Sequence, residues 1–307
     1  MIKFKILTLS VLIICSWTSY GQSEEGLEKN EDKIFKVMAY NIWNGFDWAK
    51  DEDRHQKFIN WVNSKKPDVL ALQELCGYTQ EELESDAKKW GHNYAIILKE
   101  KGYPVGLTSN KPIELKEKAK EGLWHGMLHA ETWGIDFFVV HLSPADRDFR
   151  YKEAMIIGEK IQNIKNENYI VLGDFNAHSP YDADQDKAHK SHLNKVRASD
   201  AKNEKHNNLM DEQFDYSVIS SFLTLPLIDV TPRFVSANDR FTFPAEALVG
   251  TWQTKESIVK NRVRIDYILT SRALGMKCVE VQVFNGEDTT LLSDHFPLMA
   301  EFHYEDK

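Results

Sequence analysis

Cysteine is scarce in this sequence, and the few cysteines show no zinc-site spacing. Only Cys76 and Cys278 lie beyond residue 21 of the 307-residue chain. A structural zinc site needs a closely spaced set of Cys and His ligands, and a small disulfide scaffold needs many cysteines, so both classes are excluded. A single Cys76–Cys278 disulfide stays open, although two separate buried thiols are the expected state.

Motifs that hold phosphate or nucleic acid by themselves are absent too. No glycine loop precedes a Lys–Ser or Lys–Thr pair, which excludes a P-loop nucleotide site. No concentrated basic run occurs, and 38 basic residues face 47 acidic ones. Generic attraction to a polyanion is therefore weak. This counts against a tight nucleic-acid binder, but not against an enzyme that contacts one phosphate through a metal ion.

The first 21 residues have the pattern of a secretory signal peptide. Two lysines precede a short apolar run, Ile6–Cys15, and small or polar residues follow, so cleavage is expected near Gly21–Gln22. Cleavage removes two lysines and no acids, which leaves a net charge of −11. We expect a secreted or periplasmic protein without stable membrane insertion, because the run is too short to span a bilayer. Lipid attachment at Cys15 is disfavoured, since the two isoleucines before it are bulky.

Residues 33–305 are predicted to form one α/β domain after a polar tail at 22–32. Helices are predicted at about 51–64, from residue 79, at 146–165 and at 211–225. Apolar runs predict strands, among them IFKVMAYNIW, DVLALQEL, IDFFVVHL, YIVLGDFN, VRIDYILTS and HFPLMAEFHY. A polar insertion from about 181 to 208 interrupts this order, and its composition predicts a mobile surface segment.

Polar side chains recur where the predicted strands end. The set consists of Asn41, Glu74, His141, Asp174, Asn176, Asp266, Asp294 and His295. Each residue alone has an ordinary explanation as a turn or cap residue. Their shared placement indicates more, because strand ends of one layer converge on one edge, where binding sites are commonly built.

The residue types in this set suit one kind of chemistry. Asn, Glu and Asp oxygens are the ligands that Mg²⁺ prefers, and Mg²⁺ keeps waters or substrate phosphate oxygens in its shell. A metal ion with a His–Asp pair activates water and neutralises charge on a phosphoryl group. Further Asn and His donors stabilise the developing negative charge.

The blocks MAYNIW, LALQEL, VVHL, VLGDFNAHSP, RIDYILTS and SDHFPLMAEF, in this order, resemble the signature of the endonuclease/exonuclease/phosphatase superfamily. The resemblance extends from about Ile34 to Tyr304. It implies a deoxyribonuclease I-like α/β fold, a four-layer αββα sandwich with two packed mixed β-sheets flanked by helices. It also implies phosphoester hydrolysis that depends on Mg²⁺, with Mn²⁺ as a substitute.

The resemblance also implies roles for individual residues. Metal binding falls to Asn41, Glu74 and Asp294, and catalysis to His141, Asp174, Asn176, Asp266 and His295. Substrate contacts are expected from Asn41, Asn176, His178 and Arg264, with a solvated loop and strand solubility as the alternatives for the last two. Whether Asp174 or His295 is the general base, and whether one or two metal ions bind, stays open.

The resemblance leaves the substrate open between a phosphate mono- or diester of small size and a nucleic acid. The acidic charge favours a small ester, and a secreted deoxyribonuclease I-like nuclease is the alternative. His141 matches branches other than the abasic-site endonucleases. A sphingomyelinase-like phospholipase C is less favoured, because the long apolar β-hairpin of that group is absent from this sequence. An inactive binding module is also less favoured, because such proteins usually lose some catalytic residues and all of them are present here. A monomer is expected.

Overall fold

The computed structural model of the protein describes residues 33–251 and 253–304. The predicted signal peptide, the tail at 22–32 and Cys15 lie outside these residues. Within the described ranges, the helices are all too short or too polar to cross a bilayer. Cys76 and Cys278 are both buried and both free, which confirms the expectation of two separate thiols.

The first β-sheet has six strands in the order β13-β14-β1-β2-β4-β3. Their bounds are Cys278–Val283, Leu298–Tyr304, Lys33–Asn41, Val69–Gln73, Gly106–Ser109 and Tyr94–Ile97. At its centre β1 and β2 pair in parallel, with Asn41 opposite Gln73. Because parallel strands end at the same edge, Asn41 and the residue after Gln73, Glu74, are brought together there.

The second β-sheet also has six strands, in the order β11-β12-β8-β7-β6-β5. Their bounds are Leu227–Asp229, Asp266–Ser271, Tyr169–Asp174, Ile135–His141, Met127–Thr132 and Glu114–Ala119. The central pair β7 and β8 is parallel and aligns His141 with Asp174. The antiparallel neighbour β12 aligns Asp266 with the same Asp174. Three of the predicted site residues therefore lie side by side on adjacent strands.

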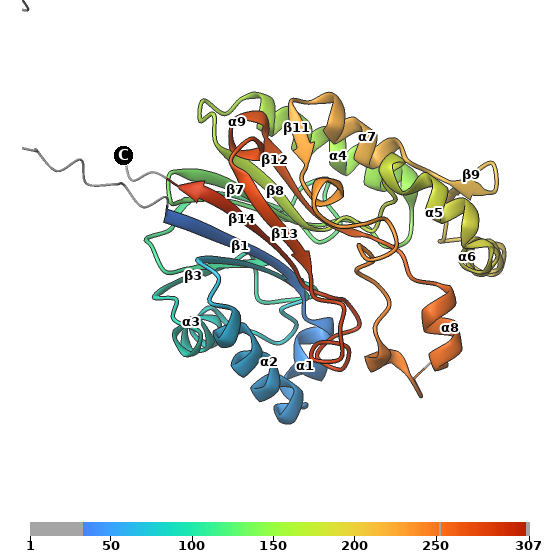
Figure 1. The fold of residues 1–307 in the computed structure, drawn as a ribbon, viewed down its shortest axis with the longest axis horizontal. Coiled ribbons are helices and arrows are strands. Elements are labelled where there is room, and N and C mark those ends of the chain that lie inside the picture. Colours follow the sequence, from blue (N-terminus) through green and yellow to red (C-terminus); the bar gives the residue numbers. More distant parts are fainter. Residues whose placement is uncertain (1–32, 252, 305–307) are drawn as a thin grey trace, which may run out of the picture. The chain divides into compact units, whose positions relative to one another are not determined.

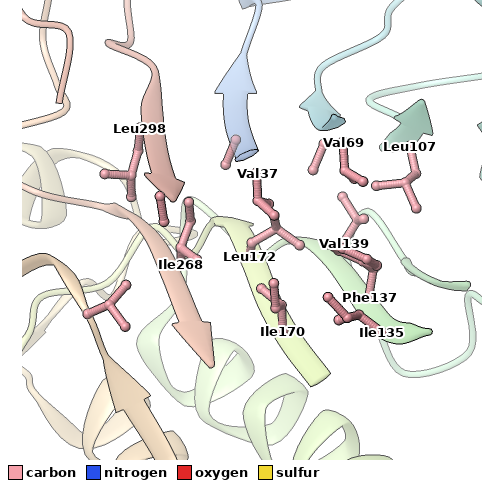
Figure 2. Packing of buried hydrophobic residues seen from close by; sticks show 14 of the residues in the cluster. Val37, Val69, Leu107, Ile135, Phe137, Val139, Ile170, Leu172, Ile268 and Leu298 are labelled. Carbon is pink, nitrogen blue, oxygen red and sulfur yellow. The ribbon is translucent and has the colours of Figure 1, made fainter. Parts of the chain in front are cut away.

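The two sheets pack face to face over a shared apolar core (Figure 2). Alternate residues of each strand point into it, as Val37 on β1 and Phe137 and Val139 on β7 do. The residues between them, such as Met38 and Phe138, point outward to separate cores beneath the helices. Strands buried on both faces need nearly continuous apolar sequence, which explains why these segments were readable from the sequence.

Helices cover both outer faces of the paired sheets (Figure 1). Helices α2 (Glu52–Lys65) and α3 (Gln80–Lys89) cover the first sheet, and α4 (Arg147–Gln162) and α7 (Ser217–Thr224) cover the second. Thr79 and Glu82 form a capping box at the start of α3, which satisfies two free N–H groups of the first turn. The predicted four-layer αββα architecture is thus confirmed.

The polar insertion contains two helices that the sequence analysis does not predict. They are α5 (Ala183–Ala188) and α6 (Lys190–Lys202). Helix α6 has no buried residue, but Asp182 and Asp186 of the insertion are buried. The polar composition does not exclude helices, because Ala and Lys are good helix formers. The shorter elements that complete the described chain are α1 (Trp43–Ala49), β9 (Leu209–Met210), β10 (Gln213–Phe214), α8 (Lys255–Lys260), α9 (Arg272–Gly275) and three short 3₁₀ turns.

Candidate active site

Asn41, at the end of β1, links two carboxylates of the two sheets. Its buried side-chain amide donates to Glu74 Oε1 at 3.2 Å and to Asp174 Oδ2 at 3.1 Å. Its Oδ1 accepts a hydrogen bond from the N–H of Trp43 at 3.1 Å. Both ends of the amide are therefore held within the protein, which positions Asn41 between the two carboxylates. Its Oδ1 keeps a second lone pair, and metal ligation by Asn41 stays a prediction.

Glu74 is held by an unusual stretch of backbone that follows β1. All residues of α1 have positive φ, from 51° at Trp43 to 64° at Ala49, so this short turn is left-handed. Its Asn44 N–H donates to Glu74 Oε2 at 2.7 Å. Gly45 is required in this turn, because an added Cβ would lie 2.0 Å from the carbonyl oxygen of Cys76. Glu74 itself has a φ of 60°, so backbone strain collects at this carboxylate.

Asp174, at the tip of β8, is the centre of the cluster. Its Oδ1 accepts from the N–H of Asn176 at 2.8 Å. Its Oδ2 lies 3.5 Å from His141 Nε2 and 3.7 Å from His295 Nε2. Burial, together with the charge of Asp266, raises the pKa of Asp174 to about 8. A carboxyl group in this position holds or releases a proton near neutral pH.

His295 and Asp266 form a buried pair. His295 Nδ1 lies 2.9 Å from Asp266 Oδ2, which leaves Nε2 facing Asp174. The His295 main chain is fixed as well, because its N–H donates to Ser293 Oγ, which donates to the Asn41 carbonyl oxygen at 2.6 Å. Burial alone would lower the pKa of His295, but Asp266, Asp294 and Asp174 raise it well above its ordinary value.

The cluster brings together more carboxyl groups than the protein keeps ionised without a further cation. Glu74, Asp174, Asp266 and Asp294 contribute four carboxyl groups. Against them stands the protonated His295, while burial and the neighbouring His125 hold the pKa of His141 well below its ordinary value. Burial raises the pKa of Asp294 to about 7, and Glu74 adds to the effect.

These residues fit a divalent cation. Ligand atoms of Asp174, Asp266 and His295 lie within 4.8 Å of one another, but two of these groups already bond each other. Glu74 and Asp294 supply further oxygens, and one buried oxygen, Asp266 Oδ1, has no hydrogen-bond partner. Hard oxygen donors with surplus negative charge are what Mg²⁺ and similar ions require.

Comparison with protein-family models identifies the family of this chain. The model described as the Endonuclease/Exonuclease/phosphatase family matches residues 38–295. The chain belongs to this family. The match begins inside β1 and ends at His295, so it contains every residue of the cluster. A search of curated proteins gives no match to this chain.

Solved structures share the family fold at low sequence identity. An AP endonuclease from Archaeoglobus fulgidus has a TM-score of 0.64 and 18% identity, over 88% of this chain and 100% of its own. A 3′-5′ exonuclease from Neisseria meningitidis has a TM-score of 0.63 and 20% identity, over 88% and 100%. TDP2 from D. rerio, complexed with a single-strand DNA product, has a TM-score of 0.60 and 17% identity, over 89% and 100%. The shared architecture and the family match together support a hydrolase.

Two predicted substrate contacts lie outside the family cluster. Arg264 is buried, and its Nη2 lies 2.7 Å from Asp182 Oδ2 and 2.8 Å from Asp229 Oδ2. These two carboxylates balance its charge, which favours a structural role, and the phosphate contact stays a prediction. His178 stacks on Phe214 and its Nδ1 lies 3.0 Å from both Asp186 oxygens. It lines a pocket with Asn176, and a substrate contact there stays a prediction.

Sequence reasoning missed residues that the fold brings to the cluster. His125, before β6, stacks on His141 with ring centres 4.1 Å apart. Phe243 packs against His295 at 4.9 Å. Arg150, on the inner side of α4, lines the same pocket as Asn176. Neither His125 nor Phe243 follows a strand within a recognisable block, and only the folded chain reveals their positions. Arg150 could have been noticed in the sequence, because it is a charged residue among the apolar positions of a predicted helix.

Proposed function

We propose that this protein is a Mg²⁺-dependent phosphoesterase that hydrolyses phosphate mono- or diesters by attack of water. The observation that carries the proposal is the unbalanced charge of the cluster. Three carboxyl groups, those of Glu74, Asp174 and Asp294, lie around the His295–Asp266 pair, and a bound divalent cation would balance them. In proteins of this family such a centre faces a phosphate group, which brings its own negative charge to the metal.

Glu74 and Asp294 are the residues that would hold the cation. When bound, the cation supplies charge neutralisation at the phosphate and lowers the pKa of an attached water. Glu74 is prepared for this role because Asn41 and the Asn44 N–H fix both of its oxygens. Mn²⁺ is expected to replace Mg²⁺, since both accept oxygen ligands.

The remaining residues handle the proton and the phosphate oxygens. Asp266 orients the His295 ring through Nδ1 and stabilises its charged form, as a carboxylate does for a catalytic histidine. His295 Nε2 and Asp174 Oδ2 face each other at 3.7 Å, so whichever of the two is unprotonated would take the proton from water, and the other would hold its own proton beside it. Neutral His141 and the side chain of Asn176 are hydrogen-bond donors for the phosphate oxygens.

A nuclease is the second candidate, and an exposed group of aromatic rings favours it. Trp48 and Tyr103 contact edge to face at 6.0 Å, and Tyr103 contacts His125, which stacks on His141. Trp48 is 44% exposed and Tyr103 is 36% exposed. Aromatic rings at the mouth of a site stack on unpaired bases. The acidic net charge of the chain keeps the small phosphate ester as the first candidate.

The test is a panel of substrates with Mg²⁺ or with a chelator. It contains p-nitrophenyl phosphate, bis-p-nitrophenyl phosphate, sugar phosphates, single- and double-stranded DNA, and phosphatidylcholine. Glu74→Ala and His295→Ala should each abolish metal-dependent hydrolysis while the protein remains folded by circular dichroism. Glu159→Ala, on the exposed side of α4, is the matched control. Full activity in both site variants would refute the proposal.

We also propose that the enzyme is exported and acts as a monomer. The support for export is the pattern of the first 21 residues. N-terminal sequencing of the protein from a native-type host should begin near Gln22, in a fraction outside the cytoplasm. Sedimentation equilibrium should give one chain per particle. An intact Met1 in the mature protein, or a stable dimer, would refute the respective statement.

A further inference from the structure

A pocket of about 320 Å³ lies beside the catalytic cluster. Asn176, a member of the cluster, lines it, and so does Phe243, whose ring packs against His295. On the far side the pocket is bounded by α6 of the polar insertion, through Lys195. Its volume falls in the range of small-molecule sites, roughly 300–1,000 Å³. A substrate group attached to the reacting phosphate therefore has room here.

The pocket contains a buried arginine that has no carboxylate within ion-pair distance among the described residues. Arg150 is 4% exposed, and among the described residues its guanidinium forms no ion pair with a carboxylate. Nη1 donates to the Ser143 carbonyl oxygen at 2.8 Å and to Asn208 Oδ1 at 2.9 Å. Nε is buried and has no hydrogen-bond partner. Burial lowers the pKa of Arg150 only to about 10, so it stays positively charged at neutral pH.

Nearby carboxylates, Glu153 first, favour the charged form of Arg150 only from beyond ion-pair distance. A ligand anion that reaches the guanidinium would add the close contact that a buried charge requires. The rest of the lining agrees with an anionic ligand. Lys195 is a second cation, and no Asp or Glu lines the pocket. This is unusual in a chain whose net charge is −9. One wall is flat, because Phe214 stacks with His178 and His192.

We propose that this pocket binds a second phosphoryl group of the substrate, next to the phosphate that is hydrolysed. This inference rests on the proposed function. Arg150 and Lys195 provide the two charges, and Asn208 fixes the Arg150 guanidinium. The flat wall receives the ring that joins the two phosphates. Such a substrate is either a nucleotide with two phosphates or a sugar bisphosphate, and both offer the same charged group to the pocket.

The first test measures binding without turnover. With a chelator present, isothermal titration calorimetry compares thymidine 3′,5′-bisphosphate with thymidine 5′-monophosphate, and fructose 1,6-bisphosphate with fructose 6-phosphate. The second phosphate should tighten binding by about tenfold or more in at least one pair, as expected for charge-assisted hydrogen bonds. The pair that responds identifies the source. Equal affinities within both pairs would overturn the proposal, whether or not the protein is an active phosphoesterase.

The second test uses variants of the pocket cations. Lys195→Gln should reduce the bisphosphate preference by several-fold, and Arg150→Gln should remove it, with partial recovery in Arg150→Lys. Lys190→Gln, an exposed lysine on the same helix that does not line the pocket, should keep the full preference. Lys195 is at the surface, so its variant is informative even if Arg150 variants do not fold. An unchanged preference in Lys195→Gln, equal to that of Lys190→Gln, would overturn the role of α6.

Hydrolysis provides a third measurement that separates the two proposals. Thymidine 5′-(p-nitrophenyl phosphate) is compared with the same compound carrying a 3′-phosphate, and bis-p-nitrophenyl phosphate serves as the reference. Hydrolysis of the reference without a preference for the 3′-phosphate, together with equal affinities within both binding pairs, would refute the pocket and leave the proposed function. Tighter bisphosphate binding without any hydrolysis would refute the proposed function and leave the pocket.

Discussion

Two buried charged networks of this protein differ in how their charge is balanced. In the arginine network, Arg264 and Arg240 face Asp182 and Asp229, so two cations meet two anions. In the catalytic cluster, four carboxyl groups meet a single protonated histidine. A balanced network is complete within the protein and stabilises the fold. An unbalanced network needs a ligand to balance its charge. Charge balance therefore distinguishes a structural network from a candidate binding site without reference to sequence motifs.

The largest effect is expected from Asp266→Asn in the unbalanced cluster. Loss of the carboxylate leaves the His295 ring without its charged partner, and the comparable change in a Ser–His–Asp triad costs roughly 10⁴-fold in rate. We expect kcat to fall by about 10³-fold or more and the melting temperature to change little. Steady-state kinetics with bis-p-nitrophenyl phosphate and a thermal scan check both. A large loss of stability with normal kcat would place Asp266 with the structural residues.

The opposite outcome is expected from Arg264→Met in the balanced network. Removing the cation leaves Asp182 and Asp229 buried and partly unpaired, which typically costs about 3–5 kcal/mol of stability. Urea unfolding measures this loss, and the fraction that remains folded should keep a normal kcat. The exposed Arg272→Met is the control and should stay within about 0.5 kcal/mol of the wild type. Loss of activity in a stable Arg264 variant would restore the predicted phosphate contact.

Added Mg²⁺ should act on the unbalanced cluster alone. Binding to the folded state at 100 times Kd adds about 2.7 kcal/mol of stability. Unfolding curves with and without Mg²⁺ measure the gain. Asp294→Asn should reduce the gain strongly, and Arg272→Met should leave it intact. An equal gain in Asp294→Asn would show that this carboxylate does not hold the ion.

A smaller effect is expected from His125, which adjoins the cluster but has no carboxylate partner. Burial and nearby Lys99 lower its pKa to about 4, so the folded protein keeps it neutral. Between pH 6.5 and 4 the unfolded chain binds more protons, and stability is therefore complete above pH 6.5 and falls as the pH decreases. At pH 5.5 this costs about 1 kcal/mol. His125→Gln should reduce the acid sensitivity by that amount in urea unfolding at pH 7 and 5.5, and an unchanged sensitivity would contradict the assignment.

The fold was predictable because its core strands are nearly continuous apolar runs. The ends of those runs carry the predicted site residues, and the structure brings two of them, His141 and Asp174, side by side. The ion pairs of Arg264 could not be predicted, because sequence shows that a cation is present but not whether a carboxylate lies beside it. His125 and Phe243 were missed for the related reason that their neighbours in space are far away in sequence. The helices of the insertion were not predicted, because a polar composition does not report backbone conformation.

The alignment of His141, Asp174 and Asp266 on three neighbouring strands limits where residues can be inserted or deleted during evolution. Side chains alternate between the two faces of a sheet, so one residue added to or deleted from β7, β8 or β12 would turn a reacting group toward the wrong layer. The helical segment that carries Lys195 has no such constraint. Natural variation in length should therefore accumulate around α5 and α6, where it would alter the proposed pocket, while the strands that carry the candidate site keep their spacing.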